Sequence, residues 1–424
     1  MAEAKKKVEA TKPTPEEKQA AAEAEVDALV ARAKKALVEF ENLDQKQVDR
    51  IVAKASIAAL NKHLVLAKMA VDETGRGLVE DKATKNIFAC EHVTNYLAGQ
   101  KTVGIIREDD VMGIDEVAEP VGVVAGVTPV TNPTSTAFYK SEISIKAGNA
   151  IVFSPHPSAL RSISEAIKVI RQAIAEAGGN ENLVSCITIP TIQATDNLMK
   201  HPDVALILAT GGSAMVRAAY SSGTPAIGVG PGNGPAYIEK TADLPLAVKR
   251  IMDSKTFDNG TICASEQSVV CDKDMEDAVR AEMEKQGAYF LTDEQIAKLG
   301  KFILRANGTM NPMIVGKSAQ VIADLAGIDI PAGTKVLVAK ETGIGRGHPY
   351  SNEKLAPILA FYTADDYKEI CRLVQDILHY EGAGHTFSMH TKDPEMVNYF
   401  AMRVPASRII VNTPSALGGI GGTT

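Results

Sequence analysis

The chain has 424 residues, of which 45% are hydrophobic and 23% are charged, and its formal net charge is −7 at pH 7. This length is enough for two or three packed domains with a large core. The acidic balance argues against nucleic acid or an anionic membrane surface as the main partner. No apolar run approaches the ~20 residues that a membrane helix needs, and the N-terminal residues lack the apolar segment of a secretory signal. We therefore expect a globular, cytoplasmic enzyme.

The first segment is charged, punctuated by proline and poor in large apolar side chains, so we expect residues 1–20 to form a flexible N-terminal arm. A docking peptide for an enzyme complex or a bacterial microcompartment is the alternative interpretation. From Glu23 to about Gly75, apolar residues recur at helical spacing. This pattern predicts one amphipathic helix, followed by a second over roughly residues 44–71.

A projecting hairpin is predicted next, in the run KTVGIIREDDVMGIDEVAEP at about residues 101–120. Two short β-rich stretches flank a polar turn near Asp109 and Asp110, which is the pattern of a β-hairpin. We expect this hairpin to extend from the first domain.

From about Val121, short β-rich runs alternate with helical segments. The runs are VGVVAGV, AIVFSPH, VSCITI, VALILAT, AIGVG and AYIE. Continuous apolar strands joined by helices are what a parallel sheet buried on both faces requires, so we expect an α/β domain of the nucleotide-binding type over residues 21–250. One of the joining helices is predicted from Ser158, as its N-cap, to Ala177.

A second alternation of strands and helices follows Ile251. Its β-rich runs are QSVVC, PMIV, KVLVA, ILAFY and RIIVN. We interpret residues 251–424 as a second α/β domain, so the predicted fold class of the whole chain is α/β.

A candidate phosphate-binding turn lies in VALILATGGSAMVRAAY. An apolar strand leads to Gly211 and Gly212, and a helix begins near Ser213. Free N–H groups at a helix start can hold a phosphate, and glycine allows a close approach. A tight turn without a ligand is an equally good interpretation of this segment alone. No stretch satisfies G-x-G-x-x-G, because the glycine-dense run at residues 228–234 fails at the last position.

Among the five cysteines, Cys263 is the candidate nucleophile. It lies in KTFDNGTICASEQS, where small neighbours would leave its sulfur accessible and a following helical turn would lower its pKa. A buried structural cysteine is the alternative, and the other four cysteines are interpreted in that way. His385, in EGAGHTFSMH, is either a group that titrates near neutral pH or a hydrogen-bonded structural histidine. No histidine spacing suits a metal, so no metal site is expected.

Several segments together resemble the aldehyde dehydrogenase superfamily. They are PVTNPTSTAFYK, KAGNAIVFSPHP, LATGGSAMV, SKTFDNGTICASEQS, NEKLAPILAFY and RIIVNTPSALGGIGG. They look most like its acylating branch, in particular the aldehyde dehydrogenase half of the bifunctional aldehyde-alcohol dehydrogenases, over about residue 22 to the end. The resemblance implies a variant Rossmann cofactor domain, a catalytic α/β domain and a small oligomerisation hairpin.

The resemblance also implies the site. Cys263 matches the nucleophile, Asn132 the oxyanion-stabilising amide, and His385 a histidine near the active site of the acylating branch. The implied cofactor-binding residues are Gly211 and Gly212 at the pyrophosphate, Glu353 at the nicotinamide ribose, and Ser154 and Pro155 in the adenosine segment. In that segment many members have a lysine and a glutamate, which are absent from SPHP here. The expected cofactor is therefore NAD by branch resemblance, with NADP not excluded.

One departure from the hydrolytic members concerns the acyl acceptor. Val229 occupies about the place of the glutamate that activates water in those members. Valine cannot accept a proton, so water attack should lose general-base assistance of ~10²–10⁴-fold. A thiol is already a good nucleophile near neutral pH. The acceptor expected from this pattern is coenzyme A.

The implied reaction converts a short aldehyde, CoA and NAD reversibly to acyl-CoA and NADH, with acetaldehyde as the expected substrate. The alternatives are a hydrolytic aldehyde dehydrogenase that releases the free acid, and a docking scaffold without catalysis. The resemblance also implies a homo-oligomer, a dimer or higher. The sequence ends at GGIGGTT, whereas the family continues with a further C-terminal stretch, so a truncated chain is expected.

Overall fold

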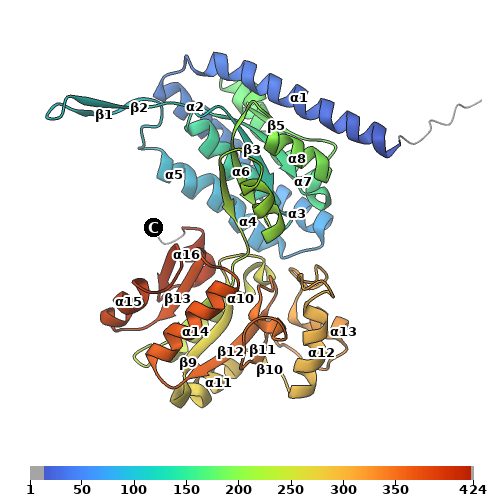
Figure 1. The fold of residues 1–424 in the computed structure, drawn as a ribbon, viewed down its shortest axis with the longest axis vertical. Helices are drawn as coiled ribbons and strands as arrows, with labels where there is room; N and C mark the ends of the chain where they lie inside the picture. Colours follow the sequence, from blue (N-terminus) through green and yellow to red (C-terminus); the bar gives the residue numbers. More distant parts are fainter. Residues whose placement is uncertain (1–13, 422–424) are drawn as a thin grey trace, which may run out of the picture.

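A computed structural model describes residues 14–421. It shows two parallel sheets, each flanked by helices, one in the upper and one in the lower half of the molecule (Figure 1). A two-stranded hairpin projects from the first half. Within the described residues, no helix is both long and apolar enough to cross a membrane.

The first sheet has five strands in the order β5-β4-β3-β6-β7, and all its pairs are parallel. Its strands are β3 (Val123–Thr128), β4 (Ala150–Pro155), β5 (Val184–Cys186), β6 (Val204–Thr210) and β7 (Ala226–Val229). Every residue of β3 and β4 is buried, which explains the continuous apolar runs in the sequence.

Helices cover this sheet. They are α1 (Pro15–Phe40), α2 (Gln45–Leu60), α3 (His63–Thr74), α4 (Val79–Ile87), α5 (Val93–Leu97), α6 (Pro133–Lys146), α7 (Leu160–Glu176), α8 (Ile192–Lys200) and α9 (Ser213–Tyr220). A π-helix at Phe88–His92 joins α4 to α5. Helix α1 packs on α8 and β4, while α7 packs between α2 and α6.

Two predictions about helix starts are wrong. Helix α1 begins at Pro15, because Thr14 and Glu17 form a capping box, so residues 14–20 are not a flexible arm. Residues 1–13, which include the rest of the proposed arm and docking peptide, lie outside the described part. Ser158 is not the N-cap of α7 either: a 3₁₀ turn precedes the helix, and His156 Nδ1 accepts a hydrogen bond from the Ser158 N–H at 3.1 Å.

The second sheet has seven parallel strands in the order β10-β11-β12-β9-β8-β13-β14. They are β8 (Gly234–Ile238), β9 (Glu266–Asp272), β10 (Ala288–Phe290), β11 (Val336–Lys340), β12 (Ile358–Ala364), β13 (Thr386–His390) and β14 (Arg408–Val411). Its helices are α10 (Leu244–Thr256), α11 (Glu276–Lys285), α12 (Asp293–Ile303), α13 (Ala319–Ala326), α14 (Tyr367–Tyr380), α15 (Pro394–Ala401) and α16 (Ser415–Gly419). Helices α10 and α11 form the core on one face, and α12–α15 contribute to the core on the other.

The change from one sheet to the other comes earlier than predicted. We expected the second unit to begin at residue 251, but β8 pairs with β9 and β13, and α10 packs on the second sheet. The crossing therefore falls in residues 230–233. The run PMIV was also expected to be a strand, and the structure makes it a turn. The run is apolar because the side chains of Ile314 and Val315 are buried, although neither residue pairs in the sheet.

The hairpin forms where the sequence predicts it. Strand β1 (Gly104–Asp109) pairs antiparallel with β2 (Ile114–Ala118), and the chain turns over residues 110–113 (Figure 1). Val111 and Met112 at its tip are 94% and 69% exposed. The hairpin therefore presents apolar side chains to its surroundings.

Candidate active site

The site is built around Cys263, which lies in the loop between the 3₁₀ turn Phe257–Gly260 and strand β9. Residues 263–265 form a turn, so the helical turn that we expected after the cysteine is absent. The side chain lines two cavities, of 330 and 300 Å³. Cys263 is thus accessible from two directions. Of the other cysteines, Cys186 is partly buried and three are buried.

The environment of the Cys263 thiol raises its pKa, contrary to our expectation. Burial is the main cause and the nearby Glu353 carboxylate is the second, and together they raise the pKa of Cys263 to about 11. The cationic side chains Arg408 and Lys85 and the cysteine's own N–H act in the opposite direction. The thiol is therefore protonated at neutral pH in the free protein.

The 330 Å³ cavity is mostly apolar on the side facing the first sheet's helices. Phe88 and Ala89 of the π-helix, together with Val93, Ile262 and Ile420, supply its apolar lining. None of the described residues that line this cavity is an aspartate or a glutamate. Two cationic side chains, Lys85 and Arg408, also line it, so the cavity suits a small molecule with a polar group near the sulfur.

The 300 Å³ cavity lies on the other side of the sulfur and includes the glycine turn. Gly211, Gly212 and Glu353 all line it, so the structure brings three of the expected cofactor residues together with Cys263. Gly212 is the N-cap of α9, and no side chain caps that helix. The backbone N–H groups at the start of α9 are therefore suited to an anionic group.

Ser154 and Pro155 do not line this cavity. The Ser154 side chain is buried, and its hydroxyl pairs with Thr195 Oγ1 at 2.7 Å. The next residue, His156, lines the cavity instead. Strand β4 ends at Pro155, and the residue after it is the one that reaches the ligand side of the sheet.

Glu353 is the acidic side chain that shares a cavity with Cys263. Its Oε1 accepts a hydrogen bond from the Gly232 N–H at 2.8 Å, and burial raises its pKa to about 8. Gly232 has no space for a side chain, because a Cβ there would lie 1.7 Å from the Cys263 carbonyl oxygen. The crossing segment between the two sheets is thus pressed directly against the cysteine loop.

His385 lies in a neighbouring cleft of 890 Å³ rather than in either Cys263 cavity. Its ring is nevertheless close to the cysteine backbone. A Cβ built at Gly232 would lie 1.7 Å from the Cys263 carbonyl oxygen and 3.0 Å from His385 Cε1. Its Nδ1 pairs with Thr386 Oγ1 at 2.9 Å, and its buried Nε2 has no hydrogen-bond partner among the described residues. Burial, followed by the charge of Arg408, lowers the pKa of His385 to about 4, so the ring is neutral at pH 7.

Val229 lines both Cys263 cavities and the 890 Å³ cleft. Its side chain therefore lies where the three spaces meet. A valine in this place offers neither a proton acceptor nor a charge.

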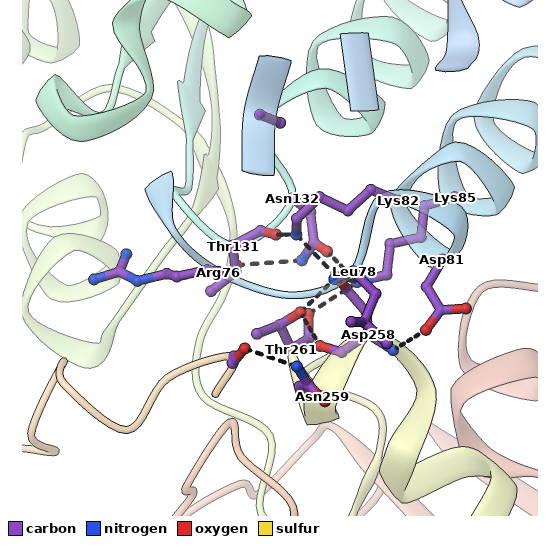
Figure 2. Close-up of polar contacts among 12 residues, drawn as sticks. Arg76, Leu78, Asp81, Lys82, Lys85, Thr131, Asn132, Asp258, Asn259 and Thr261 are labelled. Atoms are coloured by element: carbon purple, nitrogen blue, oxygen red, sulfur yellow. Dashed lines mark hydrogen bonds and ion pairs between the residues drawn. The ribbon is translucent and has the colours of Figure 1, made fainter. Parts of the chain in front are cut away.

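Asn132 lies at the start of α6 and lines both cavities with Cys263. Its Oδ1 accepts a hydrogen bond from Lys85 Nζ at 2.8 Å, and its Nδ2 donates to Thr131 Oγ1 at 3.2 Å (Figure 2). Lys85 and the Asp258 carboxylate that it binds were not among the predicted site residues. The available signal was the i, i+3 spacing of two lysines on α4, which places both on one helix face.

Comparisons with known proteins agree with this geometry. The profile of the aldehyde dehydrogenase family matches residues 1–421. The chain is 49% identical over 406 residues to aldehyde-alcohol dehydrogenase 2 of Entamoeba histolytica, which covers 93% of this chain and 47% of that protein. The chain thus spans about half the length of the curated relatives that it matches first.

Solved structures of similar proteins cover nearly the whole chain. A probable aldehyde dehydrogenase from Listeria monocytogenes has a TM-score of 0.95 and 58% identity, and covers 96% of this chain and 90% of its own. An acetylating aldehyde dehydrogenase from Geobacillus thermoglucosidasius has a TM-score of 0.93, 48% identity and the same coverage. A Rhodopseudomonas palustris propionaldehyde dehydrogenase with bound CoA and an acylated cysteine has a TM-score of 0.83 and 31% identity, and covers 93% and 89%.

The first prediction concerns the Cys263 thiol. The rate of its alkylation by iodoacetamide can be followed by mass spectrometry of its peptide. This rate should rise with pH, and the midpoint of the rise should lie above 9, the ordinary pKa of a cysteine thiol. Glu353→Gln should shift that midpoint to lower pH, because Glu353 is ionised above its own pKa of about 8 and its charge disfavours the thiolate. A midpoint near 7, or an unchanged midpoint in Glu353→Gln, would contradict this account.

The second prediction concerns the close approach at Gly232. Gly232→Ala should displace the Cys263 carbonyl and weaken the Gly232–Glu353 hydrogen bond, with a loss of about 1–3 kcal/mol in the free energy of unfolding. Urea denaturation checks this value. Gly230→Ala is the matched control, because a Cβ there meets nothing within 4 Å, and it should change stability by less than about 0.5 kcal/mol.

Proposed function

The chain belongs to the aldehyde dehydrogenase family, and we propose that it is an acylating member that passes the acyl group from Cys263 to coenzyme A. The observation that carries the proposal is that Cys263 borders two cavities, which Asn132 and Val229 also line. Val229 has the place in the sequence of the glutamate that activates water in hydrolytic members. The proposed substrate is a short aldehyde, with acetaldehyde expected. The proposed cofactor is a nicotinamide nucleotide, with NAD expected.

In the first step the sulfur of Cys263 attacks the aldehyde carbonyl, which enters through the 330 Å³ cavity, and forms a thiohemiacetal. The thiol must first release its proton to solvent in the cavity, and this loss costs free energy because burial raises the pKa of Cys263. The carbonyl oxygen becomes an oxyanion, which the Asn132 Nδ2–H and the Cys263 backbone N–H can stabilise. Contacts of this kind are worth ~3–4 kcal/mol in the transition state.

The 300 Å³ cavity suits the nicotinamide cofactor. The uncapped start of α9 at Gly212 offers N–H groups for the pyrophosphate, and Glu353 lines the same cavity for a ribose hydroxyl. A nicotinamide cofactor held by these residues would supply the hydride acceptor. The chain's own contribution is to hold the thiohemiacetal between the two cavities, so that its oxidation leaves an acyl-thioester on Cys263.

Coenzyme A is the acyl acceptor in this proposal because the described residue in the place of the family's water-activating glutamate is a valine. Val229 cannot accept a proton, and one oxygen of Glu353 is occupied by the Gly232 N–H. His385 lines the neighbouring cleft, but burial lowers its pKa to about 4, so its neutral ring is a weak base for water. Exchange of one thioester for another changes the free energy little, so the reaction runs in both directions.

Two further parts of the proposal concern assembly. The exposed apolar tip of the hairpin, at Val111 and Met112, supports a homo-oligomer, a dimer or higher. Docking to an enzyme complex or a microcompartment would involve residues 1–13, which lie outside the described part.

Two alternative functions remain to be compared with this proposal. A docking scaffold without catalysis has no need for the arrangement of Cys263 and Asn132. Hydrolysis to the free acid is the enzymatic alternative.

The acyl acceptor is tested by product analysis. With acetaldehyde and NAD, the purified chain should form NADH continuously only when CoA is present, and acetyl-CoA should accumulate in equal amount. Cys263→Ala should abolish turnover while NAD binding, measured by calorimetry, stays within twofold of the unsubstituted chain. Steady NADH formation without CoA, with acetate as the product, would support the hydrolytic alternative instead.

A gain-of-function variant tests the role of Val229. Val229→Glu places a carboxylate where the three cavities meet, and it should raise CoA-independent acetate formation by at least ~10-fold, because a general base contributes ~10²–10⁴-fold when well placed. Val229→Gln is the matched control, since it has the same shape without the base. Equal rates of acetate formation in the two variants would show that the missing base is not what excludes water.

A further inference from the structure

A buried ionic cluster connects helix α4 to the loops that carry Asn132 and Cys263 (Figure 2). At its centre the Asp258 Oδ2 accepts hydrogen bonds from Lys82 Nζ at 2.9 Å and from Lys85 Nζ at 2.5 Å. All three side chains are at most 5% exposed. Two lysines from the first unit thus bind one carboxylate from the second.

The cluster fixes an unfavourable backbone conformation just before the nucleophile. Asp258 and Asn259 have φ values of 49° and 50°, in the left-handed region. Such residues cost about 1–3 kcal/mol each and persist where surrounding contacts hold them. Asp258 Oδ1 accepts the Leu78 N–H at 2.7 Å, and Asn259 Nδ2 donates to the Gly316 carbonyl at 3.0 Å (Figure 2). The turn that leads to Cys263 is therefore held from both sides.

Lys85 makes two more hydrogen bonds, and both reach segments next to the proposed reacting groups. Its ammonium donates to the Thr261 carbonyl at 3.1 Å, two residues before the nucleophile, and to Asn132 Oδ1 at 2.8 Å. An ammonium only donates, so it must face the oxygen of the Asn132 amide rather than its NH₂ group. One N–H of that group donates to Thr131, and the other remains for the cavity that contains Cys263.

We propose that Lys85 is a positioning residue for the oxyanion site. By holding Asn132 Oδ1 and the Thr261 carbonyl on one ammonium, with Asp258 as counter-ion, it fixes the amide donor relative to the nucleophile. Lys85 also lines the 330 Å³ cavity, but in this role it acts on the oxyanion through Asn132. The proposal rests on the proposed function only for the acylation step, which hydrolytic and CoA-dependent reactions share.

Lys82 provides a matched control. It is as buried as Lys85 and binds the same carboxylate, but its other contact is the Thr131 carbonyl at 2.8 Å, not the Asn132 side chain. Loss of either lysine leaves Asp258 paired with the remaining one. Neither substitution therefore leaves an unpaired buried charge, the usual reason for a severe loss of stability.

The experiment is a pre-steady-state NADH burst with acetaldehyde and NAD but without CoA, which isolates acylation. Lys85→Met should slow the burst by ~10–100-fold, somewhat less than the ~10²–10³-fold expected for loss of the donor itself in Asn132→Ala. Lys82→Met should slow it by at most about threefold, although both lysine variants should show similar thermal denaturation. The double variant Lys85→Met/Asn132→Ala should be no slower than Asn132→Ala alone, because the lysine acts through that amide.

Three outcomes would overturn the proposal: a burst in Lys85→Met within threefold of the unsubstituted chain, equal slowing in Lys82→Met, or additive effects in the double variant. A failure of the proposed function has a different signature. In that case the unsubstituted chain gives either no burst at all or continued turnover without CoA.

Discussion

The interaction on which the site depends is the binding of the Asp258 carboxylate, in the second unit, by two lysines of helix α4 in the first. Cys263 and Asn132, the proposed nucleophile and oxyanion donor, come from different halves of the molecule, so their distance is set by whatever joins the halves. Van der Waals packing between domains tolerates small sliding motions, whereas a desolvated carboxylate bound by two ammonium groups has few alternative positions. The same contacts hold the left-handed turn that leads into Cys263.

This arrangement explains why the sulfur can be both accessible and poorly ionised. The loop is pressed against the crossing segment at Gly232, and Glu353 lies close enough to disfavour a thiolate. A protonated thiol is protected from oxidation and from unspecific acylation while the site is empty. Reactivity then has to come from the occupied site, where ligands and oxyanion donors change the electrostatic balance around the sulfur.

Structural features that depend on residues close together in the sequence were predicted correctly. The two parallel sheets and the hairpin followed from apolar runs, alternation and turn residues. Errors arose where tertiary contacts decide: PMIV is apolar because it is buried, not because it pairs, and the first strand after the crossing joins the second sheet. The expected acidity of Cys263 is wrong because burial and the Glu353 carboxylate raise its pKa, and no helix follows it to offset them. The partnership of Lys85 with Asp258 joins residues far apart in the chain, and no local pattern could reveal it.

The π-helix at Phe88–His92 makes the length of this segment as important as its composition. It places Phe88 and Ala89 in the wall of the apolar cavity, while Lys85 lies one turn earlier on the same continuous helical rod. A π-helix holds about one residue more per turn than an α-helix, so deletion of one residue there would restore regular α-helical winding without turning the preceding helix. The cavity wall would lose one side chain, while the electrostatic anchor at Lys85 kept its direction. The proposed aldehyde preference of the chain is therefore open to change through this segment without loss of the anchor.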